Sequence, residues 1–520
     1  MSDTTKKNRS RYILINTLSS YGRDIVDTIT FLILIPFIIR ILGSDNFGLW
    51  SLIWSFLAVF ELADLGFGAS VVKYVADSRG RNDMGRQRAI VCTLFWIYMA
   101  LGIIVMGGVA ISLLFFNQIF DIPQDLASSA HAVLLIIGAR SALYMPLGMF
   151  RGVLVGYQKM KITNIYKIFG GLAYFVSVLI VLSRIPDLRV LAVLNAVLGV
   201  LPMFAMMIHV KSTLPEIKLH PRYFDKSLIK ELTSFSLYFS LIQVSGLIAT
   251  RVDAVVVKLF LPLQMVAIYS IGIRLSGKAE QFCSHLTKAL TPVIAELHGA
   301  DEQQNIRAVW YRGSKLTIAF ATPLLLGLAL LAEPLIIAWT GPEFKMAVPV
   351  CQWLVAAAMI GIIHGNTTNI LSMGGYQRFL SFSLLGCQLL NLALTIIFIQ
   401  FYGISGVAMA TFIAYLPIYI GLIQTRAGKI HSRSHWDFYK NTVFPSVIPG
   451  VFMAGVLLGI MHLRPLTTLI EVAILEILGS AVFGGTFWVI GFNREERAYF
   501  KKKIFSQILK QKKRNTNAGN

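Results

Sequence analysis

Long apolar stretches, each separated from the next by a short polar segment, recur along the whole of this 520-residue chain. A helix needs about 20 largely apolar residues to cross roughly 30 Å of hydrocarbon, so each stretch predicts one membrane-spanning helix. The sequence therefore predicts an all-α polytopic membrane protein with about 14 transmembrane helices. The expected spans are 12–41, 47–72, 89–116, 126–150, 163–183, 190–209, 231–260, 265–292, 313–335, 347–372, 380–400, 406–425, 442–462 and 466–492.

The overall composition excludes several other classes of protein. Apolar residues make up 56% of the chain and charged residues only 14%, whereas soluble proteins carry about 25%. The formal net charge of +21 does not indicate nucleic-acid binding, because no basic domain lies outside the expected spans. The four cysteines all lie in apolar stretches without the spacing of metal ligands, so we expect neither a metal site nor a cofactor.

The distribution of Lys and Arg between the loops predicts the orientation in the membrane. With the N-terminus in the cytoplasm, only Arg184, Arg189, Lys345 and Arg464 lie in outer loops, and most other basic residues lie in cytoplasmic ones. We therefore expect a multi-pass protein of the inner (plasma) membrane with both termini in the cytoplasm. The basic tail 494–520 is expected to lie against the anionic membrane lipids.

An internal repeat relates the two halves of the chain. At an offset of 219 residues Trp50-Ser51 aligns with Tyr269-Ser270, and Gly156-Tyr157-Gln158-Lys159 aligns with Gly375-Tyr376-Gln377-Arg378. Halves with an even number of spans enter the membrane in the same orientation and form parallel repeats around a central cavity. The expected domains are the halves 1–210 and 231–428, the connecting loop 211–230, two additional helices in 429–493 and the tail 494–520.

Ionisable residues inside the expected spans mark the candidate site, because they are costly in lipid and usually face a cavity or a partner. The candidate substrate-binding residues are Arg23, Arg140, Arg251, Arg274 and Lys278. The candidate coupling or ion-pairing acids are Asp24, Asp27, Glu61, Asp64 and Asp253. Lys167, Lys258, Lys288 and Glu280 complete the intramembrane set, which carries a surplus of two positive charges. No catalytic residue is predicted.

The surplus positive charge favours an anionic substrate. Guanidinium groups bind phosphate oxygens bidentately and stay charged when partly desolvated, so we expect Arg23, Arg140 and Arg274 to line one cavity for a phosphate or pyrophosphate. The alternative is that Arg23–Asp27 and Arg251–Asp253 are ion pairs that only fix helix packing. No G-x-x-x-x-G-K-[ST] loop is present, so transport is expected to be driven by a gradient of H⁺ or Na⁺ rather than by ATP.

Two segments near the N-terminus, FLILIPFIIRILGSDNFGLWSL (31–52) and DLGFGASVVKYVA (64–76), carry a family resemblance. The chain resembles, over about 12–430, the polysaccharide biosynthesis transporters, which are O-antigen and exopolysaccharide flippases of the superfamily that also holds MATE exporters and lipid II flippases. The resemblance implies a flippase that moves an undecaprenyl-pyrophosphate-linked oligosaccharide from the cytoplasmic to the outer leaflet by alternating access, in contact with polysaccharide polymerase machinery.

Two other function classes compete with a polysaccharide flippase. Another transporter of the superfamily, for lipid II or for drugs, remains an alternative, although a cationic-drug exporter would need an acidic cavity. An enzyme acting on lipid-linked sugars would need a large outer loop, but the longest outer loops, near 117–125 and 336–346, have about ten residues, too few for a folded subdomain. We therefore expect a transporter and not an enzyme.

Overall fold

The computed structural model describes residues 3–64, 67–494 and 496–498, and within them leaves out the side chains of 3–21, 61–63, 234–243 and 250. All regular elements in these ranges are helices, and nine of them are long and apolar enough to cross a membrane. A tenth span is obtained if the bent pair Ala347–Ile363 and Gly365–Met373 is one crossing. The predicted all-α multi-pass fold is confirmed, whereas the number of 14 spans stays a prediction.

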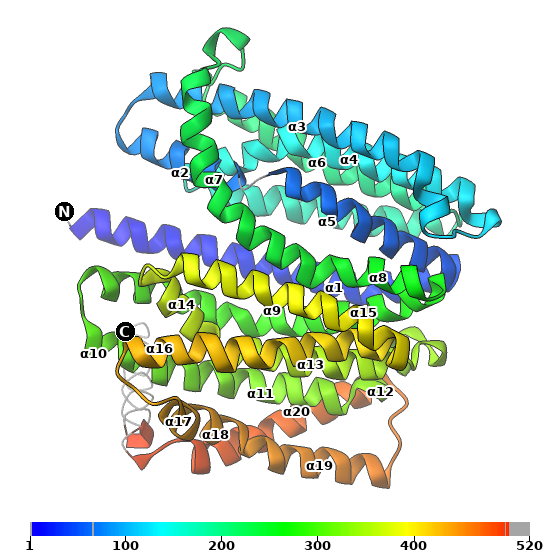
Figure 1. Ribbon diagram of the computed structural model, residues 1–520, viewed down its shortest axis with the longest axis vertical. Helices are drawn as coiled ribbons and strands as arrows, with labels where there is room; N and C mark the ends of the chain where they lie inside the picture. The colour runs from blue at the N-terminus through cyan, green and yellow to red at the C-terminus, as the bar shows by residue number, and fades with distance from the viewer. Residues whose placement is uncertain (1–2, 65–66, 495, 499–520) are drawn as a thin grey trace, which may run out of the picture. The chain divides into compact units, whose positions relative to one another are not determined.

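The chain divides into two compact units (Figure 1). The first contains the described residues up to Ser270 together with Thr395–Val407, and the second contains Ile271–Leu394 and the described residues from Ala408 onward. The division expected from the sequence, into two repeats, a connecting loop, two additional helices and a tail, stays a prediction.

Besides part of α15 (Gln377–Tyr415), the described part of the first unit contains nine helices, the last of which continues into the second unit. They are α1 (Asp3–Leu57), α2 (Phe67–Gly80), α3 (Met84–Ile119), α4 (Gln124–Gly156), α5 (Met160–Leu182), α6 (Leu188–Thr213), α7 (Lys226–Leu247), α8 (Asp253–Phe260) and α9 (Leu263–Gly299). Short 3₁₀ segments cover Ala58–Asp64 and Pro221–Tyr223, and a π-helical turn covers Ile248–Val252. The helix pairs α3/α4, α4/α6, α5/α6 and α1/α5 pack side by side.

The second unit contains the remaining helices. They are α10 (Gln303–Ala308), α11 (Ser314–Leu330), α12 (Ala332–Thr340), α13 (Ala347–Ile363), α14 (Gly365–Met373), α15 (Gln377–Tyr415), α16 (Gln424–Ile430), α17 (His435–Phe438), α18 (Phe444–Val447), α19 (Pro449–Leu463) and α20 (Leu469–Thr486). A 3₁₀ turn covers Pro342–Phe344, and π-helical turns cover Val309–Gly313, Leu416–Ile423, Tyr439–Val443 and Phe487–Gly491. Helix α11 packs against α13, α19 and α20.

Two pairs of expected spans are joined without a loop. The 55-residue α1 covers the expected span 12–41 and part of 47–72, and it bends at Gly43, whose φ is +82°. Helix α15 continues past 400 into the next expected span and bends at Gly403, with a φ of +56°. Glycine is needed at both bends because a Cβ disfavours positive φ. At 1.5 Å per residue α1 is about 80 Å long, more than twice the hydrocarbon thickness, so its two arms are separate segments.

The expected span 47–72 is also interrupted at its other end. After α1 the chain forms the 3₁₀ segment Ala58–Asp64, and α2 begins at Phe67. The side chain of Asp64 accepts a hydrogen bond of 3.4 Å from the backbone N–H of Gly68 and so satisfies a donor in the first turn of α2. An aspartate that seemed buried in a span by its apolar neighbours therefore lies at a helix start.

Close contacts between glycines and apolar side chains set the spacing of the helices around α4. A Cβ on Gly152 would lie 2.8 Å from Val71 of α2, and one on Gly138 would lie 2.5 Å from Val109 of α3. Phe150 and Val153 on the same helix are fully buried in the core of the unit. In contrast, Ile103, Leu114 and Phe169 are about 70% exposed, as expected for side chains that face lipid.

Candidate functional site

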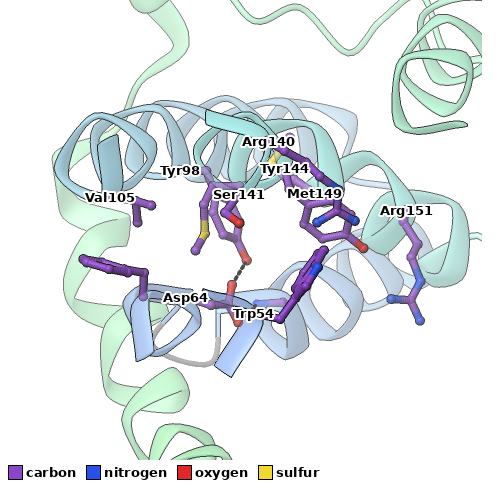
Figure 2. A pocket seen from close by; sticks show the side chains of 13 residues that line it. Trp54, Asp64, Tyr98, Val105, Arg140, Ser141, Tyr144, Met149 and Arg151 are labelled. Atoms are coloured by element: carbon purple, nitrogen blue, oxygen red, sulfur yellow. Dashed lines mark hydrogen bonds between the residues drawn. The ribbon is translucent and has the colours of Figure 1, made fainter. Parts of the chain in front are cut away.

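A cavity of about 500 Å³ lies in the first unit, between the C-terminal arm of α1 with its 3₁₀ extension and the helices α2, α3 and α4 (Figure 2). It is lined by Trp54, Phe60, Asp64, Gly68, Tyr98, Val105, Arg140, Ser141, Tyr144, Met145, Gly148, Met149 and Arg151. Aromatic rings, two arginines and one carboxylate therefore share one enclosure within a unit that is otherwise apolar. Such a pocket, apolar with a few polar groups, is the usual form of a ligand site.

Helix α4 supplies the positive charge of the cavity. Arg140, Tyr144 and Arg151 stand at spacings of four and eleven residues, which bring all three onto one face because eleven residues make about three turns. Figure 2 shows this face lying along the cavity. The two guanidinium groups start from backbone positions about 16 Å apart along the helix axis. The pocket can therefore contact an elongated anionic ligand at two points.

The guanidinium of Arg140 lies over aromatic rings. Its central carbon is 4.9 Å from the ring centroid of Trp54 and 5.8 Å from that of Tyr144. A glycine on α6 makes room for it, since a Cβ on Gly199 would lie 2.8 Å from the Nε of Arg140. Stacking on aromatic faces fixes the plane of a guanidinium. The local packing thus fixes the orientation of the Arg140 guanidinium at the cavity wall.

The acid of the cavity is Asp64, which joins two elements. Its Oδ1 accepts a hydrogen bond of 2.5 Å from the hydroxyl of Tyr98 on α3, and its Oδ2 accepts the contact from the Gly68 amide described above. The ring of Tyr98 is almost fully buried, 3% exposed. Figure 2 shows the dashed contact between the two side chains across the cavity floor. The carboxylate is held in place by two donors, so its position is well defined.

A second polar cluster connects α1 with α5. The guanidinium of Arg23 forms an ion pair with Asp24 at 2.7 Å and a longer one with Asp27 at 3.7 Å. Its Nη1 also lies 3.5 Å from the amide oxygen of Asn164 on α5. Lys167 of α5 lies near the charged groups of Arg151, Arg23 and Asp27. Arg151, which lines the cavity, therefore links it electrostatically to this cluster.

Five of the predicted residues lie in the cavity or in the neighbouring polar cluster of the first unit. Arg23, Asp24 and Asp27 form the cluster, while Arg140 and Asp64 line the cavity. Together with Arg151 and Lys167 this region holds four cations and three carboxylates, a surplus of one positive charge. That this region binds an anionic ligand stays a prediction.

The other predicted residues lie elsewhere. Arg251 is in the π-helical turn Ile248–Val252, and Asp253 is 3% exposed and accepts a hydrogen bond of 2.6 Å from Tyr269. Among the residues described, Asp253 forms no ion pair with Arg251. Arg274 and Lys278 lie on the part of α9 in the second unit. The prediction that Arg274 shares a cavity with Arg23 and Arg140 stays a prediction.

Some predicted features lie outside the described residues. They are the side chain of Glu61, Leu65 and Gly66 of the DLGFG segment, and most of the basic tail. In the described part of the chain, no group of three or more His, Cys, Asp and Glu side chains could hold a metal ion.

Sequence reasoning missed Arg151, Trp54, Tyr98 and Tyr144 as lining residues. The three-turn spacing from Arg140 could have identified Arg151, since it predicts the same helix face. Nothing comparable identifies Trp54 or Tyr98, because their places depend on how α1 and α3 pack against α4. Aromatic residues are frequent in the expected spans, and their spacing along the chain does not reveal which of them share a cavity.

Several known proteins are similar to this chain. A protein from Haloferax volcanii described as "Probable low-salt glycan biosynthesis flippase Agl15" is 22% identical over 49% of this chain and 53% of its own length. The matched stretch thus spans about half the length of this curated relative. Among solved structures, lipid II flippase MurJ in an inward closed conformation covers 91% of this chain and 99% of its own, with 14% identity and a TM-score of 0.69.

A multidrug resistance MATE family transporter of the MOP superfamily, in an inward-facing conformation, covers 78% of this chain and 96% of its own. Its identity is 15% and its TM-score is 0.65. These two structures show that the chain shares their fold. The three named relatives are flippases or transporters, in agreement with the prediction that the chain is not an enzyme.

The family model for "Polysaccharide biosynthesis protein" matches residues 13–298, which is more than half of the chain and includes all of the cavity described above. The resemblance expected from the segments at 31–52 and 64–76 is confirmed, and the chain belongs to the polysaccharide biosynthesis protein family.

Proposed function

We propose that the chain is a flippase that moves an undecaprenyl-pyrophosphate-linked oligosaccharide from the cytoplasmic to the outer leaflet of the inner membrane. The observation that carries this proposal is the pair of arginines, Arg140 and Arg151, on one face of α4 in an aromatic cavity. Family membership and the description of the Haloferax relative as a glycan biosynthesis flippase support it.

The chemistry of the cavity suits such a substrate. A diphosphate presents several oxygens to guanidinium groups, and the orientation of the Arg140 guanidinium is fixed by Trp54 and Tyr144. The ring faces and the hydroxyl of Tyr144 can contact the first sugars. Arg151 and the adjacent Lys167 add positive charge along the same path. Arg251, Arg274 and Lys278 remain sequence-based candidates for further contacts.

Transport by alternating access, with coupling to an H⁺ or Na⁺ gradient, is part of the proposal. The candidate coupling acids with described side chains near the site are Asp24, Asp27 and Asp64. Membrane lipids surround the protein, both termini lie in the cytoplasm, and polysaccharide polymerase machinery is the expected partner. The alternative function is transport of lipid II or of a small solute by the same fold.

The test is a reconstitution experiment with the full chain in proteoliposomes. A fluorescent polyprenyl-pyrophosphate oligosaccharide is placed in both leaflets, and its accessibility to a membrane-impermeant glycosidase on one side is followed with time. We expect the wild type to make the whole pool accessible and the double variant Arg140→Ala/Arg151→Ala to leave the inner pool protected. The matched control is Arg184→Ala, an exposed arginine in the loop between α5 and α6.

The outcomes separate the alternatives. Unchanged transport in the double variant would remove the α4 arginines from the site. Transport of lipid II, but not of the fluorescent oligosaccharide used in the assay, would replace the proposed substrate by the alternative one. Arg274→Ala in the same assay tests the candidate from the second unit.

A further inference from the structure

A second cavity, of about 400 Å³, lies in the second unit near the ends of three membrane-spanning helices. The spans Gln303–Leu330 and His435–Leu463 begin near it, and the span Leu469–Gly491 ends at it. It is lined by Tyr311, Arg312, Lys315, Lys440, Asn441, Pro445, Ile490, Gly491, Phe492, Asn493 and Glu496. Because the cavity lies near span ends, we expect it at the level of the lipid headgroups.

Three π-helical turns meet at this cavity. The turn Val309–Gly313 supplies Tyr311 and Arg312, the turn Tyr439–Val443 supplies Lys440 and Asn441, and the turn Phe487–Gly491 supplies Ile490 and Gly491. A π-helical turn widens the helix locally and is frequently found at functional sites. Three such turns around one cavity favour a role of this cavity in binding a ligand.

The walls of the cavity are basic. Arg312, Lys315 and Lys440 face a single acid, Glu496, which forms an ion pair of 2.7 Å with Lys315. With respect to the residues that the structure describes, neither Arg312 nor Lys440 forms an ion pair. The cavity thus keeps two exposed positive charges, and the amides of Asn441 and Asn493 add hydrogen-bonding capacity.

The ion pair also fixes the shape of the cavity. Glu496 accepts the backbone N–H of Asn493 at 2.9 Å, and the hydroxyl of Ser446 donates to the carbonyl oxygen of Lys315 at 3.1 Å. These contacts join the end of the last span to α11 and α18. The side chains of Arg312 and Lys440 therefore extend from backbone segments that these contacts hold in place. This pre-organisation lowers the entropic cost of binding a ligand.

Exposed apolar side chains are next to lining residues of the cavity in the chain. Leu316, Phe444, Ile448, Val489 and Ile490 are all exposed by 40% or more. Trp436, also exposed, packs edge-on against Phe444, and tryptophan is typical of the membrane–water interface. A basic cavity next to an apolar surface matches a ligand with a phosphate head and acyl chains.

We propose that this cavity binds the phosphate headgroup of an anionic phospholipid, whose acyl chains lie along the exposed apolar side chains of α11, α18 and the last span. Basic cavities between transmembrane helices are known to take anionic headgroups. A free phosphate ion shares the headgroup chemistry but gains nothing from the apolar surface, so the lipid is the ligand that both features favour.

The test is native mass spectrometry of the detergent-solubilised full chain with added dioleoylphosphatidylglycerol, dioleoylphosphatidylcholine or sodium phosphate. The variant is Arg312→Gln/Lys440→Gln, and its matched control is Lys429→Gln/Arg433→Gln, two exposed cations that do not line the cavity. We expect phosphatidylglycerol to bind the wild type and the control more tightly than the variant, by roughly 30-fold. The charge-preserving variant Arg312→Lys/Lys440→Arg should retain binding.

Three results would overturn the proposal. They are equal retention of phosphatidylcholine and phosphatidylglycerol, equal loss in the control pair, or displacement of the lipid by millimolar sodium phosphate. The last result would assign the cavity to a free anion. The readout is lipid binding rather than transport, so it is independent of whether the flippase assay succeeds.

Discussion

Tyr98 and Asp64 are 34 residues apart in the chain, yet the tyrosine hydroxyl donates a hydrogen bond of 2.5 Å to the aspartate Oδ1. The bond joins the middle of α3 to the segment that precedes α2. It holds the one carboxylate of the cavity opposite the two arginines of α4. An ion or a proton that binds the carboxylate of Asp64 must therefore change its hydrogen bond with Tyr98.

The first prediction concerns the stability of this contact. Tyr98→Phe keeps the buried ring but removes the donor, so we expect a loss of roughly 1–3 kcal/mol in the free energy of unfolding. Asp64→Asn should cost a similar amount, and the double variant should cost less than the two losses together because both remove one interaction. Thermal melting of the four proteins in detergent measures the difference. Additive losses would show that the pair is not coupled.

The second prediction concerns the stacking of Arg140 on Trp54. Trp54→Leu removes the aromatic face, and we expect substrate affinity in the proteoliposome assay to fall by roughly 2-fold to 30-fold. Trp54→Phe should lose less, and Arg140→Lys should keep part of the activity because it keeps the charge without the bidentate fork. Trp96→Leu, at a tryptophan of α3 that does not line the cavity, is the control. A loss in the control equal to that in Trp54→Leu would argue against a stacking role.

The third prediction concerns orientation. Reporters fused after residues 80, 160, 220, 300 and 435 should report cytoplasm, because these loops carry most of the Lys and Arg. Reporters inserted near 121, between α3 and α4, and near 340, between α12 and α13, should report the outside. A cytoplasmic signal at 121 would reverse the proposed orientation and with it the direction of transport.

The fourth prediction concerns the start of α7. Asp225 accepts hydrogen bonds from the hydroxyl and the backbone N–H of Ser227, and these hold the pKa of its carboxyl below the usual value. A depressed pKa in the folded protein stabilises it above the unfolded pKa of about 4, and this stabilisation is lost as the pH falls through the folded pKa. Asp225→Asn keeps the cap without titrating.

The stability difference between the wild type and Asp225→Asn should therefore be largest near neutral pH and should shrink as the pH falls below about 4. Melting curves of both proteins across pH 3 to 7 measure it, with Asp187→Asn, another helix-capping aspartate, for comparison. A difference that stays constant over this range would mean that the cap carries no charge-dependent stabilisation.

The apolar pattern was sufficient to predict an all-α multi-pass fold, but not every helix boundary or the bends within helices. For the spans from α3 to α6 the expected and observed ends agree within a few residues. The bends at Gly43 and Gly403 could not be predicted, because a glycine in a span is compatible with a straight helix, a bend or a loop. Hydropathy indicates how strongly a segment partitions into lipid, but it contains almost no information on the φ and ψ angles of that segment.

The candidate site could be predicted only as a set of charges. The sequence identified Arg23, Arg140 and Asp64 because charges inside apolar segments are conspicuous. It could not identify Tyr98 as the partner of Asp64, because a tyrosine is unremarkable in a span and the contact depends on the packing of two helices. Pairing by helical spacing also ranked Asp27 above Asp24 as the partner of Arg23, whereas the flexible arginine side chain reaches its neighbour more closely.

The last prediction follows from that arrangement of Arg23. Its Nη2 lies 2.7 Å and its Nε 3.2 Å from the same oxygen of Asp24, while Asp27 is 3.7 Å away and more exposed. A short charge-assisted contact on a less exposed acid is worth more than a long one near solvent. We expect Asp24→Asn to lower the melting temperature clearly and Asp27→Asn to lower it little.

The contact between Arg23 and Asp24 also determines how an exchange of charge between positions 23 and 27 must be interpreted. Arg23→Asp with Asp27→Arg places a carboxylate at position 23 directly beside Asp24, and like charges repel strongly where water is scarce. Loss of folded protein in that swap would therefore reflect Asp24 rather than a role of Asp27 in coupling. Adding Asp24→Asn to the swap removes the repulsion, so the triple variant should recover expression. If it also recovers transport, Asp27 serves as a helix-packing partner, whereas a folded but inactive triple variant would support direct participation of Asp27 in coupling.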